Sequence, residues 1–94
     1  RDNQHGEKAF EMVLSSWFLR LSVADEPGVL AEIAGTLGEN SVSIESVIQE
    51  GRGDEAELVL ITHEAPEKAL KTSLVQLTAL SSVSNITSTL RVYS

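Results

Sequence analysis

Apolar and polar residues alternate along the chain from Trp17 to Ala24. A period of two sends successive side chains to opposite faces, so this segment is predicted to be a strand with one buried face. The polar turn from Asp25 to Gly28 follows at once and ends the strand. The positions predicted to face the core are Leu19, Leu21 and Val23.

Two later segments have the apolar spacing of helices that lie against a sheet. Pro27 is expected to open the first and Pro66 the second, because proline lacks an N–H and its φ suits a first helical turn. Gly38 and Asn40 are residues of the kind that end a helix. The predicted core stripes are Val29, Leu30, Ile33, Ala34 and Leu37 in the first helix, and Ala69, Leu70, Ser73, Leu74 and Leu77 in the second.

Three further strands are predicted at residues 42–48, 56–63 and 86–92. A glycine-rich turn at residues 50–54 would join the first two as a hairpin. The centre of the strand at 56–63 is apolar on both faces, which suits a central strand or one covered by a partner. The strand at 42–48 would place one set of side chains on a single face, namely Val42, Ile44, Ser46 and Ile48.

The resulting order is strand, helix, strand, strand, helix, strand. Two strand–helix halves joined by a hairpin predict the ferredoxin-like βαββαβ sandwich of the α+β class. Right-handed crossovers would place both helices on one face of a four-stranded antiparallel sheet. The opposite face is then predicted to carry Arg20, Ser22, Thr87, Thr89 and Arg91.

The chain has 94 residues, which fits one domain. Residues 17–94 are predicted to form that domain. Residues 1–16 are predicted to be a linker, or a remnant of processing or tag removal, in which residues 9–16 have the spacing of one helical turn. Because the first residue is Arg1 rather than methionine, the chain is expected to be a fragment of a longer protein.

Charge and composition narrow the range of partners. The formal charge of −7 disfavours nucleic acid, whose binders need a basic surface, and equally disfavours an anionic membrane. No apolar run approaches the length of a membrane span, and no signal-peptide pattern opens the sequence. The absence of cysteine removes disulfides and thiolate chemistry and suits a cytoplasmic protein.

The sequence contains no constellation typical of catalysis or metal binding. Metal sites need clustered ligands, whereas the two histidines, His5 and His63, lie far apart. No serine has the glycine-flanked setting or the adjacent base of an activated nucleophile. We therefore expect no catalytic residue, no metal site and no cofactor in this chain.

The turn from Asp25 to Leu30 is the one segment whose residues suit a ligand. The N–H groups at the start of a helix attract an anion, and Gly28 lets a ligand approach the backbone closely. A free amino acid would place its carboxylate on these N–H groups and its ammonium beside Asp25. The alternative is structural, with Asp25 capping the helix and Gly28 shaping the turn.

Residues 25–34, Asp-Glu-Pro-Gly-Val-Leu-Ala-Glu-Ile-Ala, and residues 37–44 resemble the signature of the ACT domain family. That signature has an acidic or polar residue before Pro-Gly-Val-Leu, then a helix, and then a strand opening near Asn-x-x-x-Ile. The resemblance extends over residues 17–93. Within the family, residues 18–21, 61–65 and 43–49, Ser-Ile-Glu-Ser-Val-Ile-Gln, are most similar to the C-terminal domain of homoserine dehydrogenases.

The resemblance implies a homodimer in which second strands pair into one continuous sheet. An amino acid would bind where the first loop of one subunit meets the second-strand entrance of the other. Asp25 would contribute its side chain, and the residues after Pro27 their backbone donors. Ser43 departs from relatives that have asparagine at this position. The ligand contacts implied are Asp25, Gly28, Val29, Leu30, Asn40, Ser43 and Ile44.

The same resemblance implies a parent enzyme that reduces aspartate semialdehyde with NAD(P) and is inhibited by threonine, which makes threonine the favoured ligand. The catalytic part of such an enzyme does not lie in this chain. Two other functions stay open at this point: a module that assembles subunits without binding a ligand, and a small enzyme of the same fold.

Overall fold

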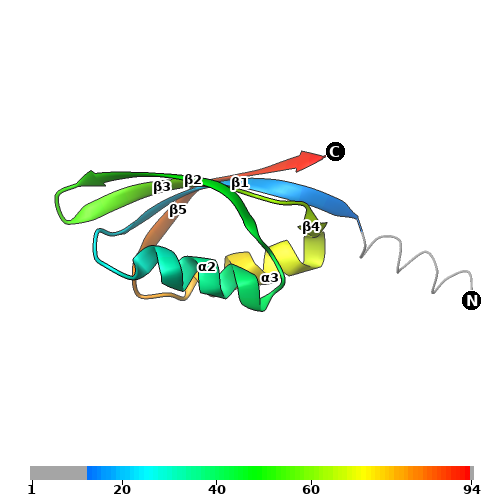
Figure 1. Ribbon diagram of the computed structural model, residues 1–94, viewed down its shortest axis with the longest axis horizontal. Helices are drawn as coiled ribbons and strands as arrows, with labels where there is room; N and C mark the ends of the chain where they lie inside the picture. Colours follow the sequence, from blue (N-terminus) through cyan, green and yellow to red (C-terminus); the bar gives the residue numbers. More distant parts are fainter. Residues whose placement is uncertain (1–12, 94) are drawn as a thin grey trace, which may run out of the picture.

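The computed structural model describes residues 13–93, and residues 1–12 of the predicted linker lie outside them (Figure 1). The α+β, ferredoxin-like class predicted from the sequence is confirmed, with two helices against an antiparallel sheet. The elements are β1 (Leu14–Ala24), α2 (Val29–Glu39), β2 (Ile44–Arg52), β3 (Glu55–Thr62), β4 (Ala65–Pro66), α3 (Glu67–Thr78) and β5 (Val83–Tyr93).

Strand β1 lies at the centre of the sheet. It pairs with β5 along one edge and with β3 along the other, and β2 pairs with the far side of β3. Every pair is antiparallel, and both helices cover the same face (Figure 1). The two-residue strand β4, which the sequence did not predict, continues the β3 edge by pairing Ala65 with Ser15. Of the two alternatives predicted for β3, a central strand or one covered by a partner, the structure shows the first, since β3 pairs with both β1 and β2.

The core lies between this face of the sheet and the two helices. The three inward positions predicted on β1 are all buried, as are the centres of the helical stripes. Burying a leucine or isoleucine side chain contributes roughly 1.5–3 kcal/mol, so the apolar contacts across this layer dominate the stability of the domain. The most deeply buried apolar residues are Leu19, Leu21, Ile33, Leu37, Leu58, Leu60 and Leu77.

Strand β1 begins at Leu14, three residues before the predicted strand and inside the segment expected to be a linker with a helical turn. Ser15 is fully buried and pairs with both Ala65 and Tyr93. The alternation of inward and outward positions therefore continues to the start of the strand, but a serine at an inward position conceals it in the sequence. The Ser15 hydroxyl and the Trp17 indole N–H are buried without a hydrogen-bond partner among the described residues.

The side chains of β2 do not all share one face, contrary to the sequence prediction. Ile44 pairs with Thr62, which is buried under the helices, whereas Ile48 pairs with the half-buried Val59 on the opposite face. The pairing register shifts between Ile44 and Ser46. A bulge of this kind inserts one extra residue into a strand, so it moves all later side chains to the other face.

A second register shift overturns part of the predicted open face. Between Arg20 and Leu21 the pairing with β5 is interrupted. Beyond the shift, Thr89 pairs with the buried Leu19, which places it on the helix-facing side of β5. Arg91 lies on that side as well, because its Nη1 is 2.7 Å from Oε1 of Glu67 on α3.

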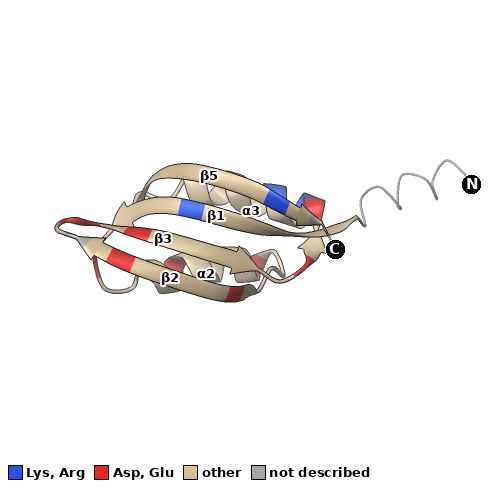
Figure 2. Ribbon diagram, turned by 90° about the horizontal axis from the view of Figure 1, so that it is seen from above, with Lys and Arg blue, Asp and Glu red and all other residues tan. Residues whose placement is uncertain are grey.

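The open face of the sheet is more apolar than predicted. Leu90 lies on the open face, where its neighbours Thr89 and Arg91 were predicted to lie. It pairs with Phe18 and is 60% exposed. On the other side of the same row, Phe18 pairs with Ile61 of β3. Figure 2 looks onto this side of the sheet; its ribbon colours mark basic residues in β1 and β5 and acidic residues in β2 and β3, although the side chain of Arg91 in β5 faces the helices. An ion pair of 3.0 Å joins Arg20 to Glu57 at its centre.

The hairpin between β2 and β3 is tighter than the predicted five-residue turn. Arg52 pairs with Glu55, so only Gly53 and Asp54 form the loop. Gly53 has a φ of 75°, the left-handed conformation that glycine favours at the first central position of a type II′ turn. The short loop extends β2 to residue 52 and brings the hairpin close to the turn that follows β1.

Helix α2 ends in a Schellman motif that lacks the usual glycine. The N–H of Ser41 donates to the carbonyl of Gly38, and the N–H of Val42 donates to the carbonyl of Leu37. Ser41 has a φ of 62°, so a serine occupies the left-handed position where glycine is usual. Gly38, one of the two predicted stop residues, lies inside the helix, whereas Asn40 is its C-cap.

The substitution Ser41→Gly is therefore expected to raise the free energy of unfolding by about 0.5–1 kcal/mol. A left-handed conformation costs a non-glycine residue roughly 1–2 kcal/mol, and the greater backbone entropy of unfolded glycine offsets part of that gain. Chemical denaturation would measure the change. The control is Ser43→Gly, a nearby exposed serine without a positive φ, which should lower stability slightly. Equal effects of the two substitutions would contradict the prediction.

Candidate functional site

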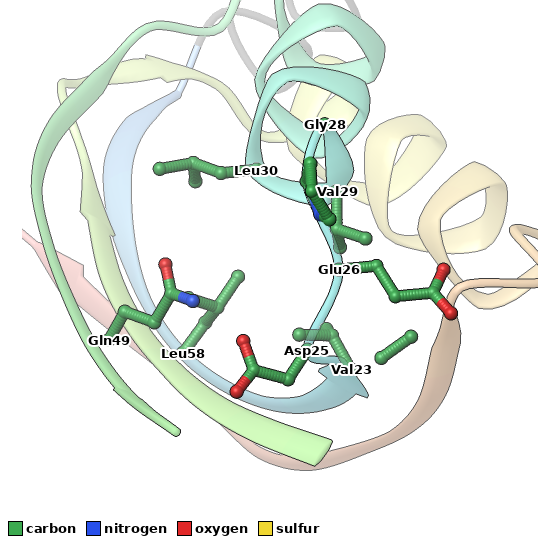
Figure 3. Close-up of a pocket in the computed structure, with 10 residues that line it drawn as sticks. Val23, Asp25, Glu26, Gly28, Val29, Leu30, Gln49 and Leu58 are labelled. Carbon is green, nitrogen blue, oxygen red and sulfur yellow. The ribbon is translucent and has the colours of Figure 1, made fainter. Parts of the chain in front are cut away.

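A hollow of about 360 Å³ lies between the first loop, the start of α2 and strand β2 (Figure 3). Its volume is at the lower end of the roughly 300–1,000 Å³ typical of small-molecule sites. Four predicted ligand contacts, Asp25, Gly28, Val29 and Leu30, line it together. The remaining lining residues are Val23, Ala24, Glu26, Pro27, Gln49 and Leu58.

The start of α2 is open to a ligand. Gly28 is the N-cap residue with a φ of 88°, and no side chain makes a capping hydrogen bond. Of the structural alternative, the part in which Asp25 caps the helix is therefore not what the structure shows, whereas the positive φ of Gly28 does shape the turn. The first N–H groups of a helix have no partner within it, and among the described residues that of Val29 makes a long contact of 3.4 Å to the carbonyl of Glu26. These donors, with the positive end of the helix dipole, suit a carboxylate.

Opposite these donors lies the carboxylate of Asp25. Its backbone N–H donates to the carbonyl of Asp54 at 3.0 Å, which ties the first loop to the β2–β3 hairpin. Figure 3 shows the side chains of Asp25 and Gln49 pointing into the same space, whereas Glu26 points away from it. A ligand in the hollow would thus meet amide donors on one side and a carboxylate with a carboxamide on the other.

The remaining wall of the hollow is apolar. Leu58 of β3 and Val23 of β1 are almost fully buried, and Val29 covers them from the helix. Leu30 is half-buried, and its side chain borders the hollow in Figure 3. An apolar wall beside the amide donors of α2 and the carboxylate of Asp25 fits a small zwitterion with a short side chain. The polar groups would orient such a ligand, and the apolar contacts would exclude water.

Gln49 was not among the contacts predicted from the sequence. It lies on β2 opposite Leu58, so it faces the helix side of the sheet at the point where α2 does not cover β2. In the sequence, Gln49 simply follows the apolar pair Val47 and Ile48 and precedes the glycine-rich turn, so nothing connects it with the first loop. The register of β2 on β3, which brings Gln49 beside the first loop, depends on the bulge at Ile44 and Ser46.

The other three predicted contacts lie at the far end of α2. The side-chain Nδ2 of Asn40 donates to the carbonyl of Thr36 and to Oε1 of Gln76. Ser43 is exposed, and its carbonyl accepts the N–H of His63. An 11-residue helix is roughly 16 Å long, so one chain does not bring its two ends into one site. Their place in a site shared by two chains stays a prediction.

Strand β2 has an unpaired outer edge within the described sheet. It is nine residues long, and the residues from Glu45 to Glu50 are exposed on both faces. Ile48 is 65% and Val47 is 37% exposed. A long edge strand with exposed apolar side chains favours pairing with another chain, because its outward N–H and C=O groups are available for a ladder.

Within residues 13–93 no group of three or more histidine or acidic side chains is placed to hold a metal ion. The same residues include no helix with the length and apolarity needed to cross a membrane. His5, one of the two histidines of the sequence, lies outside the described residues. The two features described above are a hollow of the size of a small-molecule site and, beside it, the exposed edge of β2.

Comparison with known proteins identifies relatives that are similar to this chain in sequence. Homoserine dehydrogenase of Neisseria gonorrhoeae is 42% identical over 73 residues, which is 76% of this chain and 17% of that protein. Homoserine dehydrogenase of Pseudomonas aeruginosa is 33% identical over 93 residues, or 96% of this chain and 21% of that protein. The chain thus spans about a fifth of the length of these relatives.

Solved structures agree with this relationship. A homoserine dehydrogenase from Thiobacillus denitrificans superimposes with a TM-score of 0.73 and 30% identity, over 88% of this chain and 18% of that one. The ACT domain from a GTP pyrophosphokinase of Chlorobium tepidum gives a TM-score of 0.59 at 16% identity, over 86% and 99% of the two chains, which shows the shared fold. The ACT domain family model matches residues 17–80. The chain belongs to the ACT domain family.

Proposed function

We propose that this domain is the amino-acid-sensing regulatory domain of a homoserine dehydrogenase, and that threonine is its ligand. The observation that carries the proposal is the hollow in which the uncapped start of α2 lies opposite the carboxylate of Asp25. The curated relatives that match the chain are homoserine dehydrogenases of about five times its length. Reduction of the semialdehyde with NAD(P) would then be the work of the polypeptide outside this chain.

The geometry fits the two charges of a free amino acid. Its carboxylate would accept hydrogen bonds from the N–H groups that follow Gly28, where the helix dipole also favours an anion. Its ammonium would lie beside Asp25, within reach of the Gln49 carboxamide. A short side chain would rest on the apolar wall formed by Leu58 and Val29. Threonine fits this arrangement because its hydroxyl would remain near polar groups while its methyl contacts that wall.

We further propose that the site is completed by a second copy of the chain. Pairing along the exposed edge of β2 would continue the sheet and cover Ile48 and Val47. It would also bring the segment from Asn40 to Ile44 of one copy towards the first loop of the other. A ligand held between two copies favours the arrangement that binds it more tightly, and that differential affinity is what would make it a regulator.

Threonine is expected to raise the melting temperature of the 94-residue chain. At a concentration 100 times its Kd, a ligand of the folded state adds about 2.7 kcal/mol of stability, which corresponds to a rise of about 10 °C or more for a domain of this size. Differential scanning calorimetry with a panel of the twenty amino acids would measure it. D-threonine is the matched control, since it presents the same groups in the wrong arrangement. No shift with any amino acid at millimolar concentration would refute amino-acid sensing.

The exposed edge of β2 favours a second candidate, a module that joins subunits without binding a ligand. Sedimentation velocity over a range of protein concentrations would detect the dimer. A dimer whose melting temperature and dissociation constant do not respond to any amino acid would support this second function. A dimer that tightens with threonine would support the regulatory function instead.

A further inference from the structure

Gly51 of β2 lies directly against the side chain of Asp25. An ideal Cβ built on Gly51 would lie 2.6 Å from Oδ2, 3.5 Å from Cγ and 3.9 Å from Oδ1 of that carboxylate. A separation under 3.0 Å is closer than real Cβ atoms approach, so any larger residue at this position would displace the carboxylate. The carboxylate of Asp25 therefore rests on the bare α-carbon of a residue 26 positions further along the chain.

This close approach distinguishes Gly51 from the other described glycines. Gly28 and Gly53 have φ values of 88° and 75°, so their backbone conformation accounts for glycine, and open space surrounds both. Gly35 and Gly38 also face open space. Gly51 lies in a paired strand, opposite Ala56, and has no positive φ. Its lack of a side chain is required by the neighbouring carboxylate and not by its own backbone.

Two contacts thus fix Asp25 to the β2–β3 hairpin. The backbone N–H of Asp25 donates to the carbonyl of Asp54, and its carboxylate packs on Gly51. Gly51 and Gln49 are two residues apart on β2, so they face the same side of the sheet. Gln49 projects into the hollow, while the bare position beside it leaves room for the carboxylate that also faces the hollow (Figure 3).

We infer that Gly51 is a positioning residue for the amino-acid site: its missing side chain seats the Asp25 carboxylate where it meets the ammonium of an α-amino acid. The inference rests on the proposed function and concerns the ammonium group of the ligand. Because β2 is also the edge strand proposed to join the second copy, the contact links the carboxylate to that strand. A displacement of β2 on pairing would move the carboxylate with it.

The substitution Gly51→Ala tests this directly. The group that must give way is the end of a flexible side chain, so the domain is expected to fold, while the carboxylate leaves its position. Affinity for threonine should fall about tenfold or more, the loss expected when a charged hydrogen bond is broken. Affinity for 3-hydroxybutanoate, in which hydrogen replaces the ammonium of threonine, should be unchanged, because this ligand offers Asp25 neither a cation nor a hydrogen-bond donor at that position. Isothermal titration calorimetry would give both values of Kd.

Two further proteins separate positioning from general damage. Gly35→Ala lies in α2 with open space around it and should leave both affinities unchanged. In an Asp25→Asn background, Gly51→Ala should change the threonine Kd by less than twofold, since the side chain that it displaces is then an uncharged carboxamide. An equal threonine Kd for wild type and Gly51→Ala would overturn the inference, and so would an equal loss of affinity for both ligands.

A readout without ligand keeps this inference distinct from the proposed function. The side-chain carboxyl ¹³C resonance of Asp25 should shift in Gly51→Ala, whereas that of Glu67 on α3 should not. If threonine fails to bind the wild type while this shift occurs, the sensing function is wrong and the seating of Asp25 stands. If threonine binds and neither the resonance nor the Kd changes, Gly51 does not position Asp25.

Discussion

Replacing Leu60 by alanine is expected to lower the free energy of unfolding by about 2–5 kcal/mol. Leu60 is 0% exposed at the centre of β3, between two other strands and beneath the helices. Truncation removes its apolar contacts and leaves a cavity that the paired backbone on both sides holds open. A domain of this length has a total stability of roughly 5–14 kcal/mol, so the loss is a large part of the whole.

Val59→Ala is the matched control for this change. Val59 is adjacent on the same strand and points to the open face, where it is only half-buried. Urea denaturation of the two variants should give a markedly larger loss for Leu60→Ala than for Val59→Ala. A reversed order would mean that the open face, and not the helix-covered face, carries the core of the domain.

The substitution Asp25→Asn is expected to weaken threonine binding about 10- to 100-fold. The change keeps the size of the side chain but removes the charge that would pair with the ligand ammonium, and a hydrogen bond to a charged group contributes roughly 1.5–3 kcal/mol. Asp25 is exposed and does not cap α2, so the stability of the free domain should change little. Isothermal titration calorimetry measures the affinity, and thermal denaturation without ligand measures the stability.

Glu67→Gln provides the comparison, since it removes one negative charge on α3, away from the hollow and from the segment that a second copy would contribute. Its threonine affinity should match that of the wild type. If both variants lose affinity equally, the net charge of the domain matters more than the position of Asp25. If neither loses affinity, the ammonium binds elsewhere.

The layers of the fold could be predicted from the sequence because their signals are local. Leu19, Leu21 and Val23 alternate within one strand, and the stripes after Pro27 and Pro66 have helical spacing. Each of these patterns depends only on residues a few positions apart. The apolar residues on both faces of β3 suited a central strand or one covered by a partner, and the pairing of β3 with both neighbours shows the first.

The errors arose where one strand meets another. A bulge opposite Arg20 and Leu21 moved Thr89 and Arg91 to the helix side, and a second bulge moved Ser46 away from the face of Ile44. An extra residue in a strand is invisible in its own sequence, because only the partner strand reveals the mismatch. The early start of β1 was missed because its inward position is occupied by serine.

Only part of the candidate site could be predicted from the sequence, for the same reason. The segment from Asp25 to Leu30 is continuous, so the loop and the helix start could be predicted together. Gln49 and Gly51 join that segment only through the register of β2 on β3 and the two-residue turn that follows it. No spacing within the sequence connects Gly51 with Asp25, and only the folded hairpin brings them into contact.

The exposed strand β2 also has an electrostatic consequence. Glu45 and Glu50 lie on it, in a chain with a formal charge of −7 (Figure 2). Strands that pair lie about 4.8 Å apart, so a second copy would bring two domains of the same negative net charge into contact along β2. Dissolved salt shortens the range of this repulsion from about 10 Å at 0.1 M to about 3 Å at 1 M. Self-association through β2 would therefore be governed by ionic strength as well as by a ligand.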